Sequence, residues 1–254
     1  MKYATGVVCC LMITVSSALA DVTETKKYDF ELREGGRVSL SNVNGDIHIE
    51  GIPGNQVHVV ATKKAGSQEY LDGIEIEIES TDELVRIETR HPKSRGQWLS
   101  WRDSGSGSVS YEVQVPDNVQ LDTIESVNGD IQVTAVHGSV NIETINGKMT
   151  LAGLAGDAKL DTVNGAIDAQ FDALGGAQRI SADAVNGRIL LRFPEDASAR
   201  VHAETINGGI EAGDFGLLAH KGFVGRDLDG DIGNGEARVH IDTVNGSVTV
   251  QRNK

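Results

Sequence analysis

The sequence is poor in the residue types from which many exported domains and enzymes build covalent or catalytic chemistry. Its only cysteines are Cys9 and Cys10, and both lie within the first 20 residues. If that segment is removed, the remaining chain can form no disulfide, thiol nucleophile or cysteine-ligated zinc site. Aromatic residues make up only 4% of the chain, so any core must be built mainly from aliphatic side chains.

Basic charge and catalytic motifs are also scarce. The chain has 23 Lys and Arg against 37 Asp and Glu, a formal net charge of −14. Nucleic acids and anionic membranes are bound mainly through basic surfaces, so we expect no nucleic-acid partner and no adhesion to membranes by charge. The sequence contains no Gly-x-Ser-x-Gly elbow, His-Glu-x-x-His pair or phosphate-binding loop. We therefore expect neither enzymatic activity nor a bound cofactor.

Residues 1–20 have the pattern of a secretory signal peptide. Lys2 precedes an apolar run over 7–15, and Ala18-Leu19-Ala20 forms a small-x-small cleavage site before Asp21. The run is too short to span a bilayer, and no second apolar stretch approaches that length. We expect cleavage between Ala20 and Asp21, no membrane insertion afterwards, and a mature protein that is periplasmic, secreted or at the cell surface.

An internal repeat dominates the rest of the chain. Eight of the 13 asparagines are followed by glycine, far more than random placement would give. Six of these pairs share a longer frame, in which an acid, a small residue and a Val or Ile precede the Asn; they are Asn128, Asn146, Asn164, Asn186, Asn207 and Asn245. A seventh, Ser41-Asn-Val-Asn44, lacks the acid. The spacings are 18, 18, 22, 21 and 38, and the last could hold two units, one without the motif.

Residues within a unit alternate in character. Counted from the Asn, the inward positions are −6, −4, −2, +3 and +5, as in Val140, Ile142, Thr144, Met149 and Leu151 around Asn146. This period is typical of half-buried strands, and Asn-Gly is typical of the turn between them. Two architectures fit: a hairpin turn at each Asn-Gly, or a solenoid whose rungs stack about 4.8 Å apart with a ladder of hydrogen-bonded Asn side chains. The fixed period favours the solenoid.

We therefore predict an all-β fold, with β-solenoid or β-helix-like repeats over 117–254 and an N-terminal capping β-sheet region over 21–116. The N-terminal region is β-rich but less regular, and Pro116 ends its last candidate strand. We expect the two regions to form one continuous structural unit, because an open solenoid end needs protection. Residues 214–234 interrupt the period as an irregular rung or a C-terminal flap.

The order of these motifs resembles the DUF4097 family. The resemblance rests on Ser41-Asn-Val-Asn-Gly-Asp-Ile47, Tyr111-Glu-Val-Gln-Val-Pro116, the Thr-Val-Asn-Gly series and Asp229-Gly-Asp-Ile-Gly-Asn-Gly235, which together cover nearly all of the chain after residue 20. It implies an exported, β-solenoid-like protein of bacterial envelopes, whose family name of adhesin is an inference from shape. The resemblance implies no catalytic residues.

An acid recurs at −3 in six units, as Glu125, Glu143, Asp161, Asp183, Glu204 and Asp242. Period two places it on the outside, where stacked rungs would form a row of mutually repelling carboxylates about 5 Å apart. Ca²⁺ is one cation that could offset this repulsion, although one carboxylate per rung is sparse for it. The alternative is a solvated face that lysines and arginines neutralise in part, and we assign no metal ligand.

Two histidines occupy equivalent positions in different units. His202 and His240 both lie at −5, beside Glu204 and Asp242. If their rungs are neighbours, two imidazoles and two carboxylates share a patch that could bind zinc or respond to pH. If another rung intervenes, the patch does not exist, and these side chains are solvated repeat surface.

Both tryptophans lie in one Gly/Ser-rich loop between Thr89 and Val109. Loop aromatics favour contacts with sugars or proteins, so Trp98 and Trp101 are the candidate partner-binding residues. The alternative is that they fold back as a hydrophobic lid over the end of the solenoid, because exposed tryptophan is unfavourable in water.

These features favour a non-enzymatic, adhesin-like protein that gives the bacterial envelope a rigid binding or scaffolding surface. We expect its partner to be an envelope protein or a glycan. Two alternatives stay open: a carbohydrate-active β-helix enzyme of the polysaccharide lyase or hydrolase type, and an envelope-stress accessory protein that binds a membrane partner.

Overall fold

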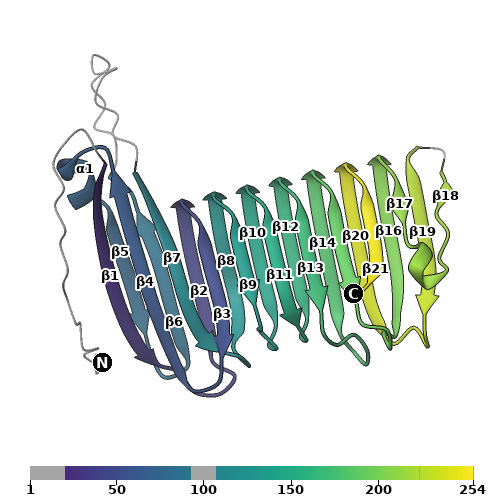
Figure 1. The fold of residues 1–254 in the computed structure, drawn as a ribbon, viewed down its shortest axis with the longest axis horizontal. Helices are drawn as coiled ribbons and strands as arrows, with labels where there is room; N and C mark the ends of the chain where they lie inside the picture. The colour runs from purple at the N-terminus through teal and green to yellow at the C-terminus, as the bar shows by residue number, and fades with distance from the viewer. Residues whose placement is uncertain (1–20, 93–106, 223, 254) are drawn as a thin grey trace, which may run out of the picture.

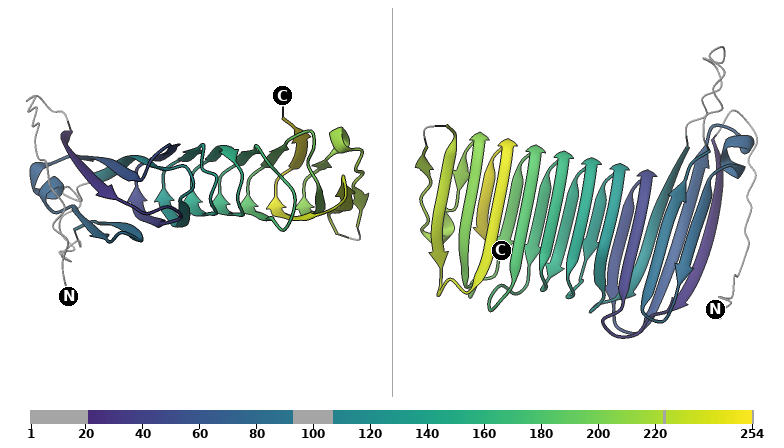
Figure 2. Two further views of the ribbon diagram at one scale, coloured as in Figure 1. Left: turned by 90° about the horizontal axis from the view of Figure 1, so that it is seen from below. Right: turned by 180° about the vertical axis from the view of Figure 1, so that it is seen from behind.

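The computed structural model describes residues 21–92, 107–222 and 224–253, which form a flattened stack of two β-sheets (Figure 1). Within these ranges, sheet A has ten strands and sheet B has eleven. The two sheets face each other along the molecule, and their strands run across its long axis (Figure 2). The predicted all-β fold is confirmed.

Each repeat unit contributes one strand to each sheet. β10 (Val140–Asn146) lies in sheet B, Gly147 turns the chain, and β11 (Met149–Leu154) lies in sheet A. β10 pairs in parallel with β8 (Gln120–Asn128) and β12 (Ala158–Asn164) of the neighbouring units. A hairpin would instead pair the two strands that flank Asn-Gly in antiparallel fashion. Asn-Gly is therefore a solenoid corner, as the fixed period predicts.

Seven such units stack in parallel within the described residues. In spatial order, their strands in sheet B are β2 (Arg37–Asn44), β8, β10, β12, β14 (Arg179–Asn186), β20 (Ala237–Asn245) and β16 (Ala199–Asn207). Their strands in sheet A are β3 (Ile47–Ile52), β9 (Ile131–Thr134), β11, β13 (Ile167–Phe171), β15 (Ile189–Phe193), β21 (Val248–Arg252) and β17 (Ile210–Glu211).

The last two units are stacked in the reverse of their chain order. β20 pairs with β14 on one side and with β16 on the other, so the final unit is inserted between two earlier ones. The described residues between these two units form η1 (Gly213–Phe215), β18 (His220–Lys221) and β19 (Arg226–Ile232). β19 pairs antiparallel with β16, and this segment closes the C-terminal end of the stack.

Strands from the N-terminal region extend both sheets at the other end. Sheet A continues through β7 (Gly107–Pro116), β4 (Gln56–Ala65) and β1 (Val22–Glu31), and sheet B through β6 (Leu84–Arg90) and β5 (Glu75–Ser80). The short helix α1 (Gln68–Asp72) begins at Ser67, whose hydroxyl accepts a hydrogen bond from the backbone of Tyr70.

No helix in the described part of the chain is both long and apolar enough to cross a bilayer. The domain division at residue 116 stays a prediction; β2 and β3, which precede it, lie in the repeat stack.

The core lies between the two sheets and is mostly aliphatic. The predicted inward positions are buried, as shown by Val140, Ile142, Thr144, Met149 and Leu151. The few buried aromatic side chains include Phe171 and Phe193, whose rings lie 5.6 Å apart in adjacent rungs.

The asparagine side chains at the seven corners form one continuous ladder, which confirms that prediction. Counted along the stack from Asn44, each later asparagine donates a hydrogen bond from Nδ2 to Oδ1 of the asparagine before it, over 2.8 to 3.0 Å. The ladder runs from Asn44 to Asn186, then to Asn245, and ends at Asn207. Because each amide is both donor and acceptor, the ladder fixes the register of the corners.

Candidate binding groove

A row of exposed aliphatic side chains runs along the corners of sheet B. It is formed by the residue at −1 of each unit, immediately before the ladder asparagine. We call it the aliphatic row; in spatial order it comprises Val43, Val127, Ile145, Val163, Val185, Val244 and Ile206. Six of the seven are 37% to 51% exposed. Soluble proteins rarely expose a contiguous line of large aliphatic side chains unless something binds there.

A row of acids runs parallel to it. We call this the carboxylate row; it comprises the residues at −3, Glu125, Glu143, Asp161, Asp183, Asp242 and Glu204. The parallel register places each acid directly opposite the acid of the next rung. The two rows lie two residues apart along each strand, which corresponds to about 7 Å.

Between the rows lies an elongated groove with a volume of about 900 Å³, which we call the corner groove. Its floor is formed by the −2 residues, of which Thr144 and Thr162 are buried and carry hydroxyls without a partner. Val224 and Arg226 line the groove where it meets the C-terminal end of the stack. The groove therefore touches all seven rungs and has one aliphatic wall and one acidic wall.

The carboxylate row is only partly neutralised. Within the described residues, Lys159 is the only lysine or arginine paired with it, with Nζ 3.3 Å from Glu143 Oε1 and 2.8 Å from Asp161 Oδ2. Asp183 lies between Asp161 and Asp242. Partial burial raises the pKa of Asp183, and the like charges of these two neighbours raise it further. Ionisation of Asp183 is therefore unfavourable in the free protein.

We predict that Asp183→Asn stabilises the protein at neutral pH. A folded-state pKa above the ordinary value means that ionising Asp183 opposes folding, so its favourable contribution is present at low pH and is lost as the pH rises through that pKa. A permanently neutral amide removes the repulsion and can still accept the hydrogen bond that Ser181 Oγ donates over 2.9 Å. The expected gain is about 0.5–1 kcal/mol, or roughly 2 °C in Tm at pH 7.

The control for this measurement is Asp168→Asn on sheet A. Asp168 forms an ion pair with Arg192, so its neutralisation should lower Tm. If Asp183→Asn also lowers Tm, the account of repulsion within the carboxylate row is wrong.

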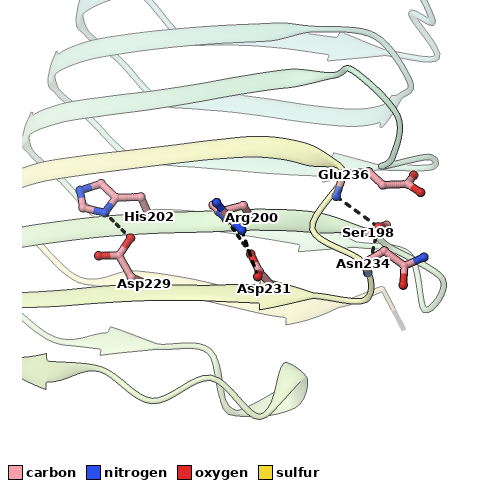
Figure 3. A network of polar contacts seen from close by, with 7 residues as sticks. All are labelled: Ser198, Arg200, His202, Asp229, Asp231, Asn234 and Glu236. Carbon is pink, nitrogen blue, oxygen red and sulfur yellow. Dashed lines mark hydrogen bonds and ion pairs between the residues drawn. The ribbon is translucent and has the colours of Figure 1, made fainter.

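Polar pairs join β19 and the turn that follows it to β16 and to Ser198, which immediately precedes β16 (Figure 3). Arg200 Nε donates to Asp231 Oδ1 over 2.8 Å. Ser198 Oγ accepts hydrogen bonds from the backbone N–H groups of Asn234 and Glu236, over 3.1 and 3.3 Å. These contacts hold the C-terminal end of the stack in register.

His202 belongs to the same network and stacks on His240. Because their rungs are neighbours, the two rings lie 5.2 Å apart and nearly parallel, at 4°. His202 Nδ1 lies 2.8 Å from Asp229 Oδ1, and its Nε2 lies 3.1 Å from Glu204 Oε1; His240 Nε2 lies 2.9 Å from Asp242 Oδ2. The patch expected for adjacent rungs thus exists, although no three His, Asp or Glu side chains in the described ranges are grouped so as to hold a metal ion.

We predict that His202 makes the attachment of β19 depend on pH. The hydrogen bond with Asp229 and the negative charges of Asp229 and Glu204 raise the pKa of His202. The stabilisation is therefore complete below pH 6.5 and is lost as the pH rises through the raised folded-state pKa. Hydrogen exchange should give β19 amides higher protection factors at pH 6 than at pH 8.

His202→Gln should remove this difference. The matched control is His58→Gln, since His58 pairs with Asp29 at the opposite end of the molecule. An unchanged pH dependence in His202→Gln would contradict the assignment.

The structure brings together some of the residues predicted to matter and leaves others aside. The acids at −3 and the two histidines lie on the outer surface of sheet B, at or beside the corner groove. Trp98 and Trp101 lie outside the described residues. The flanking residue Gly107 lies at the first corner, where its carbonyl accepts a hydrogen bond from Asn44 Nδ2 over 3.5 Å.

The aliphatic row was not predicted from the sequence. Its signal was nevertheless present, because −1 is an outward position in the same period that places −2 inside. Val or Ile fills this outward position in all seven units. An apolar residue repeated on the solvent side of a strand is a pattern that indicates a contact surface.

The chain matches one protein family and is similar to several solved structures. The model of the Toastrack DUF4097 family matches residues 13–251, whereas no curated protein matches the chain. Among solved structures, a "putative cell adhesion protein" from Clostridium sporogenes is similar, with 12% identity, a TM-score of 0.49, and coverage of 91% of this chain and 100% of that one. A "putative adhesin" from Bacteroides fragilis has 12% identity, a TM-score of 0.32, and coverage of 89% and 97%. A "putative lipid binding protein" from Parabacteroides distasonis has 11% identity, a TM-score of 0.24, and coverage of 91% and 97%.

Proposed function

This chain belongs to the Toastrack DUF4097 family, and from that premise we propose that it is an exported, non-enzymatic protein that provides a rigid binding surface in the bacterial envelope. The corner groove is that surface. The observation that carries the proposal is the aliphatic row, which is exposed on six of the seven rungs and half-buried on the other, while the −2 residues beside it are buried.

The walls of the corner groove are rigid, which favours binding. Its walls stand on strands that are paired on both sides, and the asparagine ladder runs along its edge. A partner that covers the aliphatic row gains the free energy of apolar burial without ordering a flexible site. The carboxylates recur at one repeated position on six of the seven rungs, whereas a glycosidase needs one distinct acid and one distinct base or nucleophile.

Photocrosslinking in living cells tests the proposal. A crosslinking amino acid is placed in the aliphatic row at Val163 or, as a control, at Gln132, which is exposed on sheet A. We expect a discrete adduct of higher mass from position 163 only. Adducts of the same pattern and yield from position 132, or none from position 163, would overturn the groove as the binding surface.

Enzymatic activity is tested separately. The purified protein is incubated with acidic and neutral polysaccharides, with and without Ca²⁺, and we expect no turnover. Turnover that is lost in Glu143→Gln plus Asp161→Asn would replace the binding role with that of a carbohydrate-active enzyme.

Export is tested with protease on intact and lysed cells. We expect the chain to begin at Asp21 after removal of the signal peptide. Digestion in intact cells would place the protein at the cell surface or outside, and protection until the outer envelope is opened would place it in the periplasm. A full-length chain in the cytosol would contradict export.

We further predict that Trp98→Ala plus Trp101→Ala leaves the fold intact and weakens partner binding. The measurements are Tm and the yield of the adduct from position 163, with Ser104→Ala plus Ser106→Ala as the control in the same loop. A sharp fall in Tm would indicate that the tryptophans form a hydrophobic lid instead.

A further inference from the structure

We propose that the corner groove binds an extended peptide segment of a partner protein in which basic and aliphatic residues alternate. The inference rests on the proposed function, since it names the class of partner for the same groove.

The negative charge of the acidic wall favours a positively charged ligand. The acidic wall carries six carboxylates, and Lys159 provides the only lysine or arginine partner along it in the described structure. Asp242 leaves Oδ1 buried without a hydrogen-bond partner, while its Oδ2 pairs with His240. Lysine or arginine side chains from a ligand would relieve the repulsion along this wall and gain charge-assisted hydrogen bonds.

The two facing walls match the alternating side chains of an extended peptide. An extended peptide places successive side chains on opposite sides. A segment lying along the groove therefore directs one set of side chains to the carboxylate row and the alternate set to the aliphatic row. Alternation of basic and aliphatic residues satisfies both walls at once, and the long stems of lysine can adjust to the different spacing of the rungs.

The groove is long enough to hold a short extended peptide. Seven rungs at about 4.8 Å span about 29 Å from first to last. An extended peptide rises about 3.4 Å per residue, so the groove accommodates eight or nine residues. The aliphatic row runs over this whole length, which suits a linear ligand rather than a compact one.

The lining disfavours the other ligands that a groove of this length could take. No aromatic side chain is among the described residues that line it, so sugar rings have no stacking surface there. An anionic lipid headgroup would meet the carboxylate row and be repelled. Glycans and lipids are therefore outcomes of the test rather than the expected ligands.

The experiment is fluorescence anisotropy with the purified chain 21–254 and a dye-labelled octapeptide of alternating lysine and valine. We expect saturable binding that weakens as salt increases. Replacement of the lysines by glutamate, or of the valines by serine, should weaken binding at least about tenfold.

Variants locate the site. Glu143→Gln plus Asp161→Asn should weaken binding about tenfold, and Ile145→Ser plus Val163→Ser should do the same by removing the apolar wall. The control is Glu50→Gln plus Glu112→Gln, which makes the same change in net charge on exposed strands of sheet A and should change affinity less than about twofold. Circular dichroism confirms that each variant is folded.

Three results would overturn the proposal: no binding of the lysine–valine peptide, equal binding of the glutamate–valine peptide, or equal loss in the control pair. Saturable, groove-dependent binding to phosphatidylglycerol vesicles or neutral oligosaccharides in place of the peptide would assign the groove to those ligands. If the peptide fails while the adduct from position 163 forms in cells, the partner chemistry is wrong and the binding groove stands. If both fail, the proposed function fails as well.

Discussion

Replacing Gly187 by alanine is expected to lower the free energy of unfolding by about 3 kcal/mol or more. Gly187 follows a ladder asparagine, and a Cβ at this position would lie 1.6 Å from the carbonyl oxygen of Gly165 in the adjacent rung. The clash is with backbone that hydrogen bonds hold in place, since Gly187 N–H donates to Asn245 O over 3.0 Å and Gly165 N–H donates to Asn186 O over 3.1 Å. Relief requires the rungs to move apart.

Gly209→Ala is the matched control. Gly209 also lies at a corner, but a Cβ there meets no atom within 4 Å. Urea denaturation should give a value within about 0.5 kcal/mol of the wild type or slightly above it, because alanine restricts the unfolded chain. Similar losses in the two variants would mean that close stacking of the corners does not require glycine.

Replacing Thr162 by lysine is expected to cost about 4 kcal/mol or to prevent folding. Thr162 lies at −2 of the central rung, is 5% exposed, and is in register with Thr144 and Ala184. A lysine here would place an ammonium group between the sheets without a partner, or would force the strand out of register. Thermal unfolding and expression in soluble form measure the effect.

Val163→Lys, one residue further along the strand, is the sharpest control. Val163 is 40% exposed and borders the carboxylate row, so its replacement by lysine should change stability by less than about 1 kcal/mol. Thr162→Val should also be tolerated, because the Thr162 hydroxyl is buried without a partner. If Thr162→Lys is as stable as Val163→Lys, the assignment of inside and outside is wrong.

Most of the fold could be predicted from patterns in the sequence. The period of two assigned the inward residues, and the repetition of Asn-Gly at a near-constant interval favoured a solenoid with an asparagine ladder, which the structure contains. The first feature depends on neighbours a few residues apart and the second on the spacing of one repeated motif, so both can be recognised in a single sequence.

The order of the rungs could not be predicted in this way. The strands ending at Asn186, Asn207 and Asn245 have nearly the same pattern, so any of them could lie against another. The observed order occurs together with the antiparallel pairing of β19 with β16, which is a long-range contact. The His202–His240 patch follows from that choice and was therefore conditional on it.

The candidate site was only half predicted. The recurrence of acids at −3 predicts the carboxylate row, whereas the Val or Ile at −1 is adjacent to Asn-Gly and is equally compatible with being part of the turn motif. The volume and continuity of the corner groove depend on the stacking of seven rungs, and no single repeat contains them.

Cysteine accessibility tests the central claim most directly, namely that a partner covers the aliphatic row in the envelope. The only cysteines in the sequence lie within the first 20 residues, so Val163→Cys and Gln132→Cys each place a single thiol in the chain after Ala20. We predict that the thiol at position 163 reacts with maleimide in the purified protein and is protected in the native envelope, while the thiol at position 132 reacts in both. Equal reactivity at position 163 in both settings would contradict the account.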